Sequence, residues 1–134
     1  MEDVFIEATT QRPQGNRAID AGLVTIDLLL FIKQLKYEKA WKESDRNAIT
    51  VFKTTGMCIV LVGLHKDAEM TKHTADGLIS VQVLEGQMIF NTDEESIKLS
   101  KGQMITLHEG IQHSVLAIEE TIFLLTITSS LAGK

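Results

Sequence analysis

From residue 48 onward, apolar and polar positions alternate in short segments that are separated by turn-forming residues, as at 54–56 and 100–102. A period of two over four to eight residues is typical of half-buried strands. The pattern predicts strands over 48–53, 57–65, 79–85, 87–91, 95–99, 104–107, 112–117 and 121–128. Many short strands in one small domain indicate a sandwich or barrel, and the jelly roll is one such solution to the problem of exposed sheet edges.

A helical period precedes the strands. Leu28, Ile32 and Leu35 recur at intervals of three and four, which predicts a helix over 28–36 with Asp27 as its N-cap. A second helical turn over 38–43 carries Trp41. We interpret this tryptophan as an anchor of the helical segment on the strands rather than as a ligand-stacking residue, because large aromatic side chains mostly serve as buried surface.

The chain of 134 residues has room for one core, and nothing in it suggests a second domain. Residues 1–24 have mixed character and predict an irregular arm with at most one short strand. We therefore divide the single domain into an N-terminal arm with a short helix, 1–46, and a β-domain, 47–130.

Composition narrows the class of protein. A net charge of −5 and a pI near 5.3 argue against nucleic acid as a partner, because phosphate backbones are met by clustered Lys and Arg. No stretch approaches the roughly 20 apolar residues of a membrane helix, and the N-terminus lacks a signal-peptide pattern. We expect a cytoplasmic protein without membrane partners. Cys58 lies in an apolar run and is expected to be a buried, inert thiol.

Two spaced motifs carry the candidate chemistry. The first is His73-x-Ala75-x3-Ile79-x6-Gly86, and the second is Gly102-x5-His108-x-Gly110-x2-His113-x3-Ala117. These intervals resemble the cupin superfamily, whose motifs are G-x5-H-x-H-x3,4-E-x6-G and G-x5-P-x-G-x2-H-x3-N, and in particular its small, single-domain, cupin-2-like bacterial members. The resemblance implies a mainly β fold, a single-domain antiparallel double-stranded β-helix (the cupin jelly roll), here with a short N-terminal helical arm.

The resemblance also implies where a site would lie. In cupins, three histidines and a glutamate hold a metal ion at the mouth of the barrel. His73 matches the first histidine and His113 the third, whereas Ala75 stands at the second histidine and Ile79 at the glutamate. His108 replaces the usual proline. The pair His73 and His113 is therefore the incomplete remainder of a metal-ligand set.

Strand alternation explains what replaces the missing ligands. Ile79 and Val81 point to one face of their strand, so an inward Ile79 makes the pocket wall apolar where a cation would need oxygen. The first hypothesis is therefore a protein that binds a small apolar or mixed ligand in the barrel mouth with no resident cofactor. Its expected ligand-binding residues are His73, His113, His108, Ala75, Ile79 and Val81, and no catalytic residue is assigned.

The second hypothesis is a metal-dependent enzyme of the dioxygenase or isomerase type. It uses His73, His113 and a substitute ligand around a transition metal such as Fe, Mn, Zn or Ni. The residues that offer a substitute donor are His108, Glu109, Asp76 and Glu69. His108 either compensates for the lost ligands or points to solvent, and the sequence leaves both readings open.

Association is expected as well. Small cupins often pair as homodimers through sheet faces and N-terminal strands, and two-fold dimers are the commonest oligomers. We expect the interface at the N-terminal arm and at the outward strip of Ser80, Gln82 and Leu84.

Overall fold

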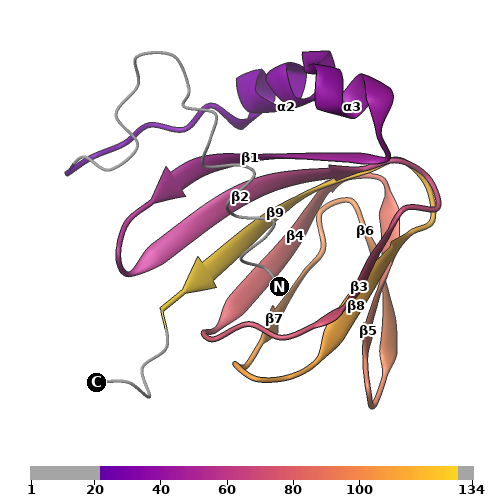
Figure 1. Ribbon diagram of the computed structural model, residues 1–134. Coiled ribbons are helices and arrows are strands. Elements are labelled where there is room, and N and C mark those ends of the chain that lie inside the picture. The colour runs from indigo at the N-terminus through magenta and orange to yellow at the C-terminus, as the bar shows by residue number, and fades with distance from the viewer. Residues whose placement is uncertain (1–21, 130–134) are drawn as a thin grey trace.

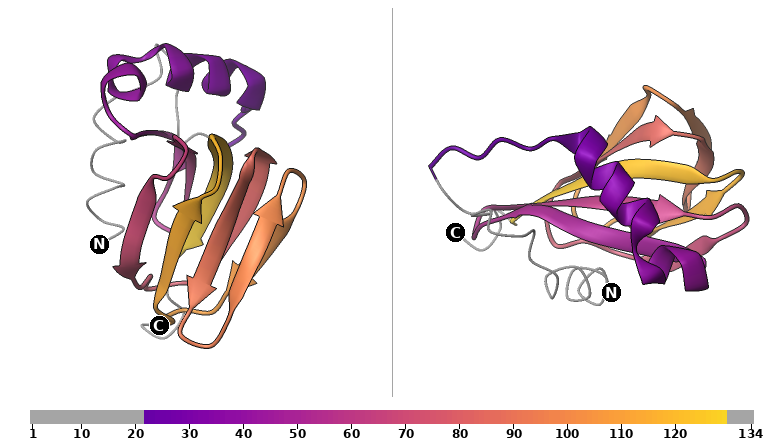
Figure 2. Two further views of the ribbon diagram at one scale, coloured as in Figure 1. Left: turned by 90° about the vertical axis from the view of Figure 1, so that its right-hand side faces the viewer. Right: turned by 90° about the horizontal axis from the view of Figure 1, so that it is seen from above.

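The computed structural model describes residues 22–129, which form two antiparallel β-sheets packed face to face, with two helices lying across the outside of one sheet (Figures 1 and 2). The five-stranded sheet has the order β1-β2-β9-β4-β7, and the four-stranded sheet has the order β3-β8-β5-β6. Apart from the β1–β2 and β5–β6 hairpins, consecutive strands lie in different sheets, in the manner of a jelly roll. The predicted mainly β, antiparallel fold is confirmed.

The elements follow the predicted order. The helices are α2 (Leu28–Tyr37) and α3 (Lys39–Glu43). The strands are β1 (Arg46–Lys53), β2 (Met57–Leu64), β3 (Glu69–His73), β4 (Ile79–Glu85), β5 (Gln87–Thr92), β6 (Ser96–Ser100), β7 (Met104–Leu107), β8 (His113–Ala117) and β9 (Thr121–Thr128). All eight predicted strands are present within two residues of their expected bounds. Asp27 caps α2 as expected, because its side chain accepts a hydrogen bond from the Leu30 amide at 3.2 Å.

Strand β3 is the element that the sequence prediction missed. Its five residues are exposed or half-buried, and Met70 alone packs against the core, so the strand shows no apolar alternation. Pairing with β8 holds it in place. This strand carries His73, so its register determines where one member of the histidine pair lies.

The main core fills the space between the two sheets. It consists of aliphatic and aromatic side chains from both, including Val81, Met88, Phe90 and Phe123, each at most 3% exposed. Ile79 belongs to this core, so its predicted inward orientation is confirmed.

A second core lies between the helices and the outer face of the five-stranded sheet (Figure 1). Leu35 and Trp41 pack there close to Gly63, where an added Cβ would lie 2.7 Å from Leu35 and 2.8 Å from Trp41. The predicted anchoring role of Trp41 is confirmed. Leu84 also packs against this helix-side core on the outer face of the sheet, where the helices cover it in part; the dimer interface expected along this strip stays a prediction.

Residues 1–21 and 130–134, which include most of the irregular arm expected over 1–24, lie outside the described part of the chain. Between residues 22 and 129, no helix is long and apolar enough to cross a membrane.

Two loops close one end of the barrel, where β3 passes into β4 and β7 passes into β8. A backbone hydrogen bond joins them, from the Gly110 amide to the Ala75 carbonyl at 2.9 Å. Gly77 of the first loop lies against the last residue of β9, where an added Cβ would be 1.6 Å from the Thr128 carbonyl oxygen. These backbone contacts fix the end of the barrel at which the candidate site lies.

Candidate functional site

The last residue of β3 and the first residue of β8 bring two histidines together. His73 and His113 are directly paired in the β3–β8 ladder, although β3 has an irregularity between Met70 and His73. Their rings are in contact, with centroids 4.3 Å apart and planes inclined by 61°. The two histidines predicted to share the barrel mouth are therefore adjacent.

Each imidazole is oriented by a hydrogen bond to the backbone carbonyl oxygen of the residue two positions earlier in the chain. Nδ1 of His73 lies 2.7 Å from the Thr71 carbonyl oxygen, and Nδ1 of His113 lies 3.0 Å from the Ile111 carbonyl oxygen. Because a carbonyl oxygen only accepts, Nδ1 carries the hydrogen in both rings. In the neutral form, Nε2 of each ring is therefore unprotonated and acts as a hydrogen-bond acceptor or a ligand to a cation.

The surroundings of the pair are aromatic and aliphatic. His113 is 5% exposed and stacks on Phe90, with centroids 5.4 Å apart and planes inclined by 12°. His73 is half-buried, so the pair extends from the core towards solvent. Ala75 and Ile79, at the positions of the family's second histidine and glutamate, are 5% and 4% exposed and belong to the core between the sheets.

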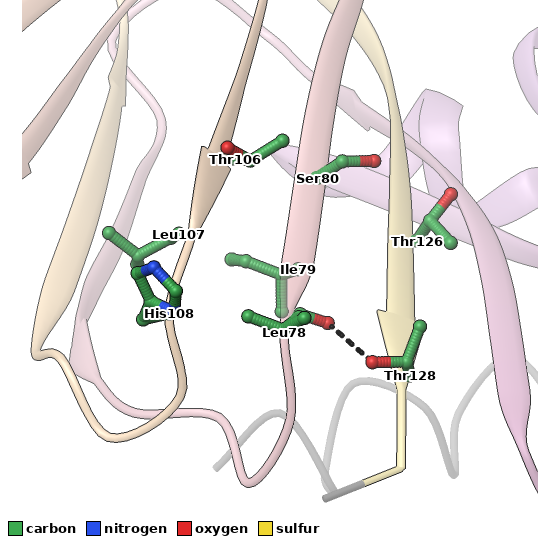
Figure 3. A pocket seen from close by; sticks show the side chains of 8 residues that line it. All are labelled: Leu78, Ile79, Ser80, Thr106, Leu107, His108, Thr126 and Thr128. Atoms are coloured by element: carbon green, nitrogen blue, oxygen red, sulfur yellow. Dashed lines mark hydrogen bonds between the residues drawn. The ribbon is translucent and has the colours of Figure 1, made fainter. Parts of the chain in front are cut away.

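His108 lies elsewhere. It follows the last residue of β7, is exposed, and lines a hollow on the outer face of the five-stranded sheet together with Ser80 and Thr106 (Figure 3). Ile79 of the expected barrel-mouth set lines the same hollow, whereas His73 and His113 do not, so a shared site for His108 and the histidine pair stays a prediction. Strand alternation accounts for the outward position of His108, since the inward residue Leu107 precedes it.

The residues present do not fit the metal ion that the cupin resemblance implies. No group of three or more His, Cys, Asp or Glu side chains that could hold a metal occurs between residues 22 and 129, so Glu69, Asp76 and Glu109 do not complete the pair. Structural and catalytic zinc sites use at least three protein ligands, and non-haem iron sites add a carboxylate to two histidines. Two imidazoles alone supply neither set.

Solved structures share this architecture. A conserved SPY1581 protein of unknown function from Streptococcus pyogenes is 21% identical with a TM-score of 0.66, over 88% of this chain and 97% of that chain. A cupin-2 domain containing protein from Shewanella frigidimarina is 18% identical with a TM-score of 0.63, over 78% and 94%. Salicylate 1,2-dioxygenase from Pseudoaminobacter salicylatoxidans is 16% identical with a TM-score of 0.70, over 87% of this chain and 37% of that chain.

The chain therefore has the fold of the cupin superfamily, as the spacing of its two motifs predicts. No protein-family model matches the sequence. No curated protein matches it either.

Two features of the site were not predicted. The stack of Phe90 on His113 depends on the pairing of β5 with β8, and neither strand adjoins the other in sequence. The hollow beside His108 combines residues of β4, β7 and β9. The sequence does show that Ser80, Thr106 and Thr126 alternate with inward apolar residues. The hollow could not be predicted from this alternation alone, because the order of the strands in the sheet was not known.

Proposed function

We propose that this domain binds a small organic molecule at the His73–His113 pair and acts as a binding protein rather than as a metalloenzyme. The observation that supports the proposal is the contact of two backbone-oriented imidazoles, one of which also stacks on Phe90. A mainly apolar lining with a few placed polar groups is typical of small-molecule sites.

The tautomer of the pair defines the chemistry of the ligand. Two Nε2 acceptors favour a molecule with a hydroxyl or carboxylic acid group, whose proton one imidazole accepts or shares. Phe90 and Ile79 favour an apolar body behind that group. The expected ligand is therefore a small, largely apolar alcohol, phenol or carboxylic acid.

The experiment is a titration of the protein with simple apolar carboxylic acids and phenols, followed by the imidazole nitrogen signals in NMR spectra. His73→Phe and His113→Phe keep a flat ring but remove Nε2, and each is expected to weaken binding by about tenfold or more. His108→Gln is the matched control, because it changes a histidine outside the pair. Equal binding by all three variants would contradict the proposal.

A metal-dependent function is the alternative, and one observation favours it. Metal-ligating histidines usually donate their second ring N–H to a carbonyl or carboxylate, as both His73 and His113 do. A stoichiometric transition metal in protein purified without chelators, lost in His113→Ala, would establish this alternative and overturn the first proposal.

A gain-of-function variant makes the metal test sharper. Ala75→His combined with Ile79→Glu restores the two side chains that the cupin motif has and this chain lacks. Metal binding stabilises the folded state by mass action, so added Mn²⁺, Ni²⁺ or Zn²⁺ is expected to raise the Tm of the double variant and leave the Tm of the unaltered protein unchanged. An equal rise in both would show that the natural pair already forms a metal site.

A further inference from the structure

A hollow of about 370 Å³ lies on the outside of the five-stranded sheet, at the end of the barrel where β4 begins and where β7 and β9 end (Figure 3). Its volume is within the range of small-molecule sites. The outward side chains that line it are Leu78, Ser80, Thr106, His108, Thr126 and Thr128. Ile79 and Leu107, which also pack in the core between the sheets, line it as well, whereas neither His73 nor His113 does.

Strand pairing arranges three hydroxyl groups in a row across this hollow. Ser80 of β4 is paired with Thr106 of β7 on one side and with Thr126 of β9 on the other. Adjacent strands lie about 4.7–4.9 Å apart, which sets the spacing of the row. The neighbouring residues Ile79 and Ile127 point inward to the core, so alternation fixes the three hydroxyls on the outer face.

The row begins where the helices stop covering the sheet. Along β9, the outward residues Ile122 and Leu124 belong to the helix-side core, and the next outward residues are Thr126 and Thr128. A solvated sheet face commonly carries charged side chains, yet none of the residues between 22 and 129 that line this hollow is an Asp, Glu, Lys or Arg. The uncovered part of the sheet is therefore hydroxyl-rich, uncharged and concave.

Several of these polar groups have no hydrogen-bond partner in the part of the chain that the structure describes. Across residues 22–129, no hydrogen bond uses the hydroxyls of Ser80, Thr106 or Thr126 or the ring of His108. The Thr128 hydroxyl, in contrast, donates to the Leu78 carbonyl oxygen at 3.3 Å (Figure 3). The hollow therefore offers three adjacent hydroxyls and one imidazole whose hydrogen-bonding capacity is directed at solvent.

We propose that this hollow binds a neutral, polyhydroxylated small molecule, such as a monosaccharide or a cyclic polyol. Hydroxyl and imidazole groups both donate and accept hydrogen bonds, so they match ligand hydroxyls of either sense. Leu78, 44% exposed, offers an apolar surface for the C–H face of a sugar ring. No Lys or Arg is among the described residues that line the hollow, so a phosphate or carboxylate group is a poor match. The proposal is independent of the ligand proposed for the histidine pair.

The test is an NMR titration of the full chain with glucose, N-acetylglucosamine and myo-inositol at millimolar concentrations. Backbone amide shifts are expected in β4, β7 and β9 around Ser80, Thr106 and Thr126. Thr106→Val and Thr126→Val keep the β-branched shape and remove one hydroxyl each, and each is expected to raise Kd by about fivefold. Thr55→Val, in the exposed β1–β2 turn, is the control and is expected to leave Kd unchanged.

Three results would overturn the proposal. The first is the absence of saturable shifts with any of the three probes. The second is an unchanged Kd in the Thr106→Val/Thr126→Val double variant, whose fold is verified by its amide spectrum. The third is a set of shifts centred on His73 and His113, which would place the sugar at the barrel mouth instead.

Discussion

The indole of Trp41 stacks on the imidazole of His65, with ring centroids 3.6 Å apart and planes inclined by 25°. Nε2 of His65 also lies 2.8 Å from the Trp41 carbonyl oxygen. Trp41 of α3 therefore contacts His65, the residue after β2, through both its indole ring and its backbone carbonyl. This contact and the helix-side core hold the helical segment against the sheet.

Truncation of the Trp41 side chain is expected to destabilise the folded protein. Trp41→Ala should lower the free energy of unfolding by about 3–5 kcal/mol, because it removes a large buried aromatic side chain and leaves a cavity. Urea unfolding monitored by circular dichroism measures the change. Tyr37→Ala is the control, since Tyr37 is 77% exposed and its loss should cost about 0.5 kcal/mol or less. Similar losses in both variants would refute the anchoring role.

The close approach of Gly77 to Thr128 predicts that any side chain at position 77 disturbs the end of the barrel. Gly77→Ala should cost about 1–3 kcal/mol, because its Cβ would be forced against a backbone oxygen and the loop must shift. Gly56→Ala is the matched control, since no non-neighbouring atom of residues 22–129 lies within 4 Å of an added Cβ there. Hydrogen exchange should show faster exchange at the Thr128 amide, which bonds to the Leu78 carbonyl, in the first variant only.

Cys58 should react slowly with alkylating reagents in the folded protein. It is half-buried, and burial raises the pKa of its thiol because the thiolate loses hydration. The pKa of the Cys58 thiol is therefore higher in the folded state than in the unfolded state. The stability that the neutral, half-buried thiol contributes is fully present at pH values below its unfolded-state pKa. This contribution is lost as the pH rises through the folded-state pKa.

Iodoacetamide labelling at mildly alkaline pH, with and without urea, measures the difference in reactivity. The rate should be lower in the folded state, and the pH at which labelling reaches half its maximal rate should be higher than in urea. Identical pH profiles in the two states would contradict the effect of burial.

We expect the chain to form a homodimer through its N-terminal arm. Leu29 and Leu30 of α2 are 74% and 60% exposed, and apolar side chains of this size are commonly covered by a partner. Leu29→Lys combined with Leu30→Lys should shift the mass measured by light scattering at micromolar concentration from dimer to monomer. Lys33→Glu, on an exposed position of the same helix, should leave it unchanged. A monomeric mass for the unaltered protein would refute this expectation.

The sequence predicted most of the fold because its strands have strong alternation and its turns have distinct residues. Strand β3 was missed because its side chains are nearly all solvent-accessible, so β8 rather than hydropathy defines it. The motif spacing placed His73 and His113 together, but it could not show their ring contact or the tautomer that the Thr71 and Ile111 carbonyls select. The sequence left the direction of His108 open because motif spacing does not specify which face a loop residue takes.

The bond from the Gly110 amide to the Ala75 carbonyl has a consequence for how this barrel tolerates change. The two loops at its mouth are joined by main-chain atoms, which are present whatever side chain occupies position 75. A metal ion is therefore not required as a structural clamp between them. Substitutions at position 75 therefore keep this main-chain link, and the side chains at the mouth can change while the two loops stay joined.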